Sequence, residues 1–151
     1  TIKFNTVITN LESYKTFGIL SNHKMQEAAD REIKVMHTKC VSSDELISAL
    51  SGGNQQKVII GKWLERSPDV FLLDEPTRGI DIGAKKLVLE LLAKMNREQG
   101  MTIIMVSSEL PEVLGMSDRI MVVHEGHVTG IIDAAGADQA KVMTLATGGS
   151  L

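Results

Sequence analysis

Residues 70–77 read Val-Phe-Leu-Leu-Asp-Glu-Pro-Thr, a compact apolar run followed at once by two carboxylates and a proline. Such a run predicts a strand that is buried on both faces. In open α/β sheets, ligands bind beyond the carboxyl ends of the strands, which is where Asp74 and Glu75 would lie. Asp74 could hold Mg²⁺, and Glu75 could orient or deprotonate a water. The structural alternative is that both residues only cap the following turn.

Residues 50–57, Leu-Ser-Gly-Gly-Asn-Gln-Gln-Lys, precede an amphipathic helical run. Ser51, Gly52 and Gly53 at a helix start would expose several backbone N–H groups, and the helix dipole adds partial positive charge there. The Ser51 hydroxyl adds one more donor, so this helix end would suit a phosphate. The bland alternative is a serine N-cap followed by flexible glycines. The two segments together, in this order and at close spacing, argue against both structural alternatives.

The rest of the chain alternates helical patterns with short apolar runs after Leu50. The patterns predict a helix over 82–99 that ends at Gly100, a strand over 102–106, a short helix over 110–114, a hairpin of 120–123 with 128–132, and a final helix over 137–145. This order predicts an α/β core with a parallel sheet, closed by an antiparallel pair. Residues 10–49 are polar and helical in pattern, without a strand. We therefore expect a helical subdomain with its lead-in over 1–50, and a core region over 51–151.

The composition is that of an ordinary globular domain of 151 residues, 43% hydrophobic and 23% charged. The net charge of -3 gives no electrostatic footprint for nucleic acid. The single Cys40 excludes an internal disulfide framework and a cysteine-based zinc site. No stretch approaches the roughly 18 to 20 apolar residues that span a bilayer, so a membrane role would act through a partner. The chain begins with Thr1, which suggests a trimmed or excised piece.

These segments resemble the motifs of ATP-binding-cassette proteins. Residues 50–57 resemble the signature motif, 72–77 resemble the Walker B motif with its catalytic glutamate, and 79–81 resemble the D-loop. The variant Asn54, together with residues 77–81, 107–112 and the tail 143–149, is most similar to the second cassette of bacterial monosaccharide importers. The match is strong over 50–149. Before Leu50 it rests only on the polar, helical pattern of the sequence.

The resemblance implies part of a P-loop NTPase core with ATP and Mg²⁺ as cofactors. In this family, ATP lies between the phosphate loop and Walker B of one cassette and the signature of the other. The implied roles are nucleotide binding for Ser51, Gly52, Gly53, Gln55 and Asp81, metal binding for Asp74, and catalysis for Glu75 and Ser108.

The resemblance also implies a set of partners. The helical subdomain would dock on membrane-spanning permease subunits, at the cytoplasmic face of the bacterial inner membrane. A second ATP-binding cassette, in the same or a fused chain, would complete the ATP sites. A periplasmic sugar-binding protein would act indirectly, and no nucleic acid is expected.

Two departures from the family pattern matter. No Gly-x-x-x-x-Gly-Lys-Ser/Thr loop occurs in these 151 residues, so this segment alone is expected to bind ATP poorly and to be inactive. Ser108 stands where the family usually has a histidine that contacts the γ-phosphate. We hypothesise that this cassette's own site is weakened while its signature completes the partner's competent site. Ser51→Arg would then reduce turnover more than Glu75→Gln.

Three functions are weighed. The favoured one is the ATP-hydrolysing, energy-coupling subunit of a sugar importer. The second is a non-transport cassette acting on DNA or ribosomes, which the acidic balance disfavours. The third is a non-catalytic regulatory or dimerisation module that contributes its signature to a partner site. The isolated piece would expose sheet edges and apolar faces, so we also expect self-association.

Overall fold

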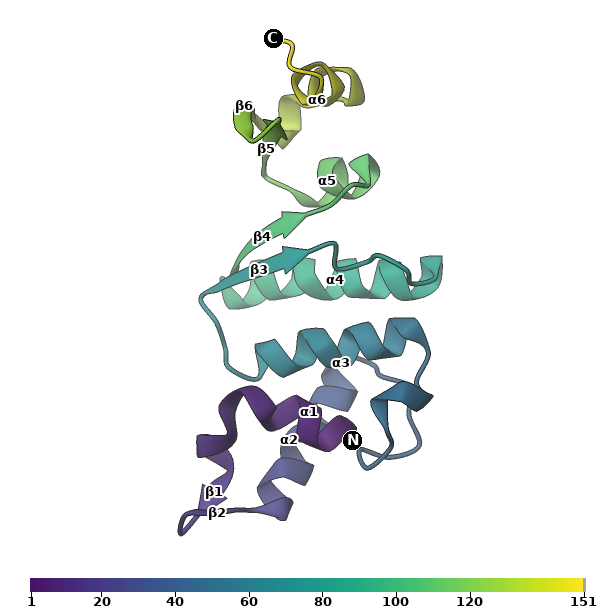
Figure 1. Cartoon of the computed structure of the whole chain (residues 1–151), viewed down its shortest axis with the longest axis vertical. Coiled ribbons are helices and arrows are strands. Elements are labelled where there is room, and N and C mark those ends of the chain that lie inside the picture. The colour runs from purple at the N-terminus through teal and green to yellow at the C-terminus, as the bar shows by residue number, and fades with distance from the viewer. Residues whose placement is uncertain (151) are drawn as a thin grey trace. The chain divides into compact units, whose positions relative to one another are not determined.

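The computed structural model describes residues 1–150 and divides into two compact units, Thr1–Met105 and a second that begins at Val106. The first unit contains α1 (Ile2–Val7), the 3-10 helix η1 (Ile8–Tyr14), β1 (Lys15–Thr16), β2 (Ile19–Leu20), α2 (Asn22–Val35), η2 (Ile47–Ala49), α3 (Gly52–Leu64), β3 (Val70–Asp74) and α4 (Ile82–Gln99), and leads into β4 (Thr102–Val106). The second contains α5 (Leu110–Met116), β5 (Arg119–His124), β6 (His127–Asp133), η3 (Ala134–Gly136) and α6 (Gln139–Ala146) (Figure 1).

β3 and β4 form a two-stranded sheet, and their arrows run in the same direction with α4 as the connection (Figure 1). The predicted βαβ order and parallel pair are thus confirmed. Local signals fix the bounds of α4, because Asp81 caps its start and Gly100 ends it in the left-handed conformation. The chain is an α/β protein.

β3 is buried on one face only. Phe71 and Leu73 are 6% and 9% exposed, whereas Val70 and Leu72 are 52% and 70% exposed. The expectation of a strand buried on both faces was therefore wrong for the residues described, because nothing in residues 1–150 covers the second face. The covered face packs into the main core, which is formed by Met36, Ile60, Leu64, Phe71, Leu73, Val88, Leu92, Met95 and Met101.

The first 50 residues are mostly helical, and α1 and α2 contact each other and α3. A short β1–β2 pair interrupts them, contrary to the expectation of no strand; its turn holds Phe17 and Gly18 at φ 51° and 82°. Two-residue strands carry no periodic pattern, so sequence alone gives no signal for them. The boundary between 50 and 51 stays a prediction, since α1 and α2 pack on α3 inside one compact unit.

The second unit is built on the β5–β6 hairpin, as predicted. Glu125 and Gly126 form the turn at φ 46° and 80°, the positive values that a tight two-residue hairpin requires. α6 covers the hairpin, and Ile120, Val122, Val142 and Leu145 form the core between them. No helix within residues 1–150 is both long and apolar enough to cross a membrane.

Candidate functional site

At the N-terminal tip of α3, Ser51 and Gly52 are exposed, as the sequence predicts, whereas Gly53 is buried. Ser51 is the N-cap residue with extended backbone angles, and its carbonyl accepts from the Gln55 N–H at 2.9 Å to begin the helix. The Ser51 side chain makes no capping hydrogen bond to the first turn in the described part of the chain. Ser51 thus occupies the N-cap position of the structural alternative, but its hydroxyl is not used to cap the first turn. A helix start of this kind presents N–H groups and partial positive charge, which suit an anion.

Two neighbouring amides hold this tip in place. Asn54 Nδ2 donates to Ser51 Oγ at 3.0 Å, and Asn54 Oδ1 accepts from the Lys39 backbone N–H at 2.9 Å. Gln55 Nε2 donates to the Leu50 carbonyl at 2.8 Å. The Gln55 amide thus has a structural partner here, and its proposed contact with a nucleotide stays a prediction. Sequence analysis missed the role of Asn54, although its departure from the usual family residue was the available signal.

Lys57 forms a second link between α3 and the loop after α2. Its side chain is buried, and Nζ donates to the His37 carbonyl at 3.0 Å. Burial lowers the pKa of Lys57, the nearby Lys39 charge lowers it further, and Asp81 opposes both. Asn54 and Lys57 lie three positions apart and so share one face of the helix. Both therefore hold the loop at residues 37–39 against the start of α3.

The α3 tip packs closely against the turn that leads into α4. A Cβ placed on Gly53 would lie 2.7 Å from Ala84 Cβ and 3.7 Å from Asp81 Oδ2. A Cβ on Gly52 would lie 3.5 Å from the Gly79 carbonyl oxygen. The structure thus brings Gly53 beside Asp81 and Gly52 beside Gly79. Asp81 also has a local duty, because Oδ1 accepts from the Ala84 N–H at 2.9 Å and caps α4.

Asp74 and Glu75 occupy the carboxyl end of β3, as predicted. Asp74 is exposed, and Glu75 is half-buried with φ 47°. A non-glycine residue in this region costs about 1–3 kcal/mol and persists only where its surroundings hold it. The buried Pro76 and Thr77 supply that support, and the Arg78 N–H donates to the Glu75 carbonyl at 3.1 Å. The strained turn fixes the Glu75 backbone immediately after the strand.

The donors around Asp74 fit a metal that is bound together with another ligand. The described residues contain no group of three or more His, Cys, Asp or Glu side chains that could hold a metal by themselves. Mg²⁺ commonly takes one or two carboxylates and completes its shell with waters and substrate phosphates. An exposed carboxylate at a strand end fits that mode.

Ser108 lies in the second unit and is exposed. Its neighbour Ser107 has a structural role, since Oγ donates to Glu112 Oε2 at 2.9 Å and accepts from the Glu109 N–H at 3.1 Å. Glu112 is 5% exposed, so this contact anchors the turn before α5. The catalytic role of Ser108 stays a prediction.

A family model described as "ABC transporter" matches residues 3–78, about half of the chain. The galactose/methyl galactoside import ATP-binding protein MglA of Treponema denticola is 61% identical over 96% of this chain. The ribose import ATP-binding protein RbsA of Bacillus subtilis is 50% identical over 98% of it. The chain spans 29% and 30% of the lengths of these two relatives.

Solved structures share the fold. A metal-chelate type ABC transporter in an inward-facing conformation has a TM-score of 0.82 at 19% identity, covering 98% of this chain and 58% of that one. A dimeric ATP-binding cassette in a post-hydrolysis state, bound to ADP and Pi, has a TM-score of 0.71 at 26% identity, covering 87% of this chain and 57% of that one. Both likenesses extend over most of this chain and over little more than half of the other.

Proposed function

This chain belongs to the ABC transporter family, and from that premise we propose that it is part of a subunit that binds and hydrolyses ATP to drive import of a simple sugar. The observation that carries the proposal is the identity of 61% to a galactose importer's ATP-binding protein and 50% to a ribose importer's, over nearly the whole chain. The exposed Ser51 at the α3 tip and the exposed Asp74 at the end of β3 support it. ATP hydrolysis needs donors for the phosphates and a carboxylate for the metal, and a ligand can reach both of these residues.

The residue roles follow from the chemistry at each position. Ser51, Gly52 and Gly53 would offer a hydroxyl and backbone N–H groups to the phosphates of ATP, with Gln55 and Asp81 nearby. Asp74 would hold Mg²⁺, which neutralises phosphate charge when bound. Glu75 would orient or deprotonate the attacking water.

The missing phosphate loop and Ser108 refine this proposal. Without the loop and its lysine, the segment by itself is expected to hydrolyse no ATP. A serine hydroxyl at 108 is neutral and short, so it replaces an imidazole poorly in orienting water and phosphate. We therefore propose that the signature of this cassette contributes more to ATP hydrolysis than its own Glu75 and Ser108 do. The signature would complete a site on a second cassette.

The proposed assembly places the subunit at the cytoplasmic face of the bacterial inner membrane. Membrane-spanning permease subunits would bind it, a second cassette would pair with it, and a periplasmic sugar-binding protein would act indirectly. Specificity for the sugar would reside in those other subunits.

The test is ATP hydrolysis by the full-length chain reconstituted with its membrane subunits in vesicles. Wild type should hydrolyse ATP and take up a monosaccharide, and Ser51→Arg should lower both by about tenfold or more, because arginine would obstruct a phosphate at the α3 tip. Asp74→Asn should lower both by a smaller factor, because its metal would belong to the weaker site. Hydrolysis without any sugar uptake would contradict the import function. Uptake that Asp74→Asn leaves unchanged would contradict the role of Asp74.

A further inference from the structure

Asn54 has hydrogen-bond partners on both ends of its amide. The Lys39 backbone N–H can only donate, so the atom facing it at 2.9 Å must be the amide oxygen. This fixes the orientation of the amide, which geometry alone leaves ambiguous for asparagine. The NH₂ group then faces Ser51 Oγ at 3.0 Å and can only donate to it.

This arrangement has a consequence for the Ser51 hydroxyl. A serine oxygen accepts on its lone pairs and donates one proton, whose direction rotates to suit its neighbours. Because Asn54 donates, the Ser51 proton cannot point toward Asn54. We propose that Asn54 is a positioning residue that turns the Ser51 hydroxyl proton outward from the exposed α3 tip, ready for a phosphate oxygen of ATP. The inference rests on the proposed function and deepens it.

The backbone N–H that orients the Asn54 amide lies outside the α3 tip, at Lys39. Lys39 lies in the loop after α2. Lys57 Nζ binds the same loop by donating to the His37 carbonyl at 3.0 Å. His37 has φ 48°, a strained value that a fixed loop can hold. Two contacts from one face of α3 therefore keep the Lys39 N–H in register with Asn54. The orientation of Ser51 depends in this way on a loop 12 residues earlier in the chain.

The experiment uses Asn54→Leu in the full-length chain with its membrane subunits. Leucine is nearly the same size, carries no charge and can neither donate nor accept. The readouts are the turnover of ATP hydrolysis and the Kd of a non-hydrolysable ATP analogue, each measured also in Ser51→Ala and in the double variant. The Kd remains measurable where turnover is lost. Thermal unfolding of each variant checks that the fold is intact.

Asn54→Leu should weaken analogue binding or turnover by about tenfold when Ser51 is present, and by less than about twofold in Ser51→Ala. An equal loss in both backgrounds would mean that Asn54 acts only on structure and would overturn the proposal. So would an effect of Ser51→Ala without any effect of Asn54→Leu. If neither Ser51→Ala nor Asp74→Asn alters binding or hydrolysis, the proposed function itself is overturned, and this inference with it.

Discussion

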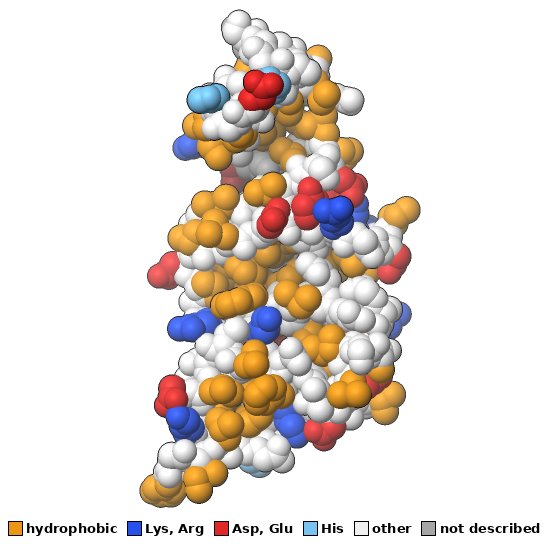
Figure 2. All heavy atoms as spheres, in the orientation of Figure 1, with side chains coloured by type: hydrophobic (Ala, Val, Ile, Leu, Met, Phe, Trp, Pro, Cys, Tyr) orange, Lys and Arg blue, Asp and Glu red, His pale blue; other side chains and the backbone are white. Residues whose placement is uncertain are grey.

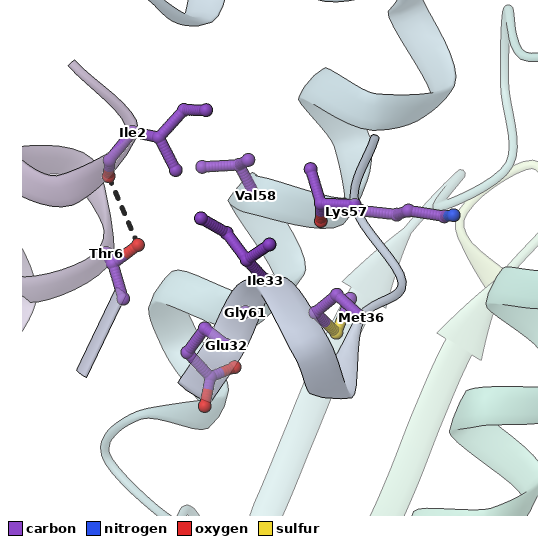
Figure 3. A pocket seen from close by; sticks show the side chains of 9 residues that line it. Ile2, Thr6, Glu32, Ile33, Met36, Lys57, Val58 and Gly61 are labelled. Carbon is purple, nitrogen blue, oxygen red and sulfur yellow. Dashed lines mark hydrogen bonds between the residues drawn. The ribbon is translucent and has the colours of Figure 1, made fainter. Parts of the chain in front are cut away.

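Glu32 is a buried carboxyl group in the helical part of the first unit. Its Oε2 atom has no hydrogen-bond partner among the described residues, and the carboxyl lies beside a cavity of about 10 Å³, the space that one water needs. Figure 3 shows Lys57, which lines the same cavity, extending away from Glu32. The neighbouring Glu65 is already engaged, since it accepts hydrogen bonds from Arg31 and Tyr14. Glu32 is therefore best accommodated in its neutral form.

Burial first, and then the nearby Glu65 charge, raise the pKa of Glu32 from 4.5 to about 7, while Arg31 opposes the shift. The unfolded chain releases this proton at lower pH than the folded protein does. The Glu32 carboxyl therefore makes its full contribution to the free energy of unfolding below about pH 4.5. That contribution is lost as the pH rises to about 7. We expect Glu32→Gln to abolish this fall and to exceed wild type by about 2 kcal/mol at pH 8, but not at pH 4.5.

Urea unfolding at the two pH values measures this difference. Glu27→Gln is the matched control, because Glu27 is exposed on the same helix. A Glu32→Gln protein that is no more stable than wild type at pH 8 would contradict the neutral-carboxyl account.

At the scale of elements, the start of α3 packs so closely on the start of α4 that no side chain fits at Gly53. A Cβ on Gly53 would lie 2.7 Å from Ala84 Cβ, a separation that real Cβ atoms essentially never show. Gly53→Ala should therefore push the α3 tip away from the turn at residues 79–81. We expect a loss of about 1–3 kcal/mol in the free energy of unfolding, the usual cost of overpacking.

The compensating change is Ala84→Gly, which vacates the space that the new methyl needs. The double variant should be more stable than Gly53→Ala alone, and a double-mutant cycle of unfolding free energies measures the coupling. Strictly additive effects would show that the two residues do not meet.

The sequence predicted elements best where local signals fix them. The bounds of α4 and β4 were predicted correctly because a helical apolar pattern and Gly100 mark the helix and a short apolar run marks the strand. The exposed positions of Ser51 and Asp74 followed from the same local logic. The close approach of Gly53 to Ala84 spans 31 residues, and the Asn54–Lys39 bond spans 15, so no local pattern reveals either. The one-sided burial of β3 depends on which elements pack on each face of the sheet, and no local pattern reveals this.

At the scale of the whole molecule, the uncovered face of the β3–β4 sheet is an apolar surface. Val70, Leu72 and Ile104 are between 50% and 70% exposed, and Figure 2 shows hydrophobic side chains gathered over these strands. A hollow of about 520 Å³ adjoins them, lined by Trp63, Arg66, Pro68, Val70, Phe71 and Leu72. Contiguous apolar surface of this kind favours association.

We expect the isolated chain to self-associate through this face. Light scattering should give a mass that rises with concentration, and Leu72→Lys should return it toward the monomer mass because a charge resists burial. Val41→Lys is the control, since Val41 is 94% exposed in the loop after α2 and lies outside this sheet. A constant monomer mass for wild type at high concentration would contradict the expectation.

The central claim is that the α3 tip serves ATP hydrolysis more than the acidic strand end of the same chain does. The measurement is the ATP turnover of the full-length chain with its membrane subunits, compared between Ser51→Arg and Glu75→Gln. Arginine at the exposed tip would obstruct a phosphate, whereas glutamine at 75 would remove a carboxylate from the site that we propose to be the weaker one. The account predicts a loss of about tenfold or more for Ser51→Arg and a clearly smaller one for Glu75→Gln. Comparable losses from both variants would contradict it.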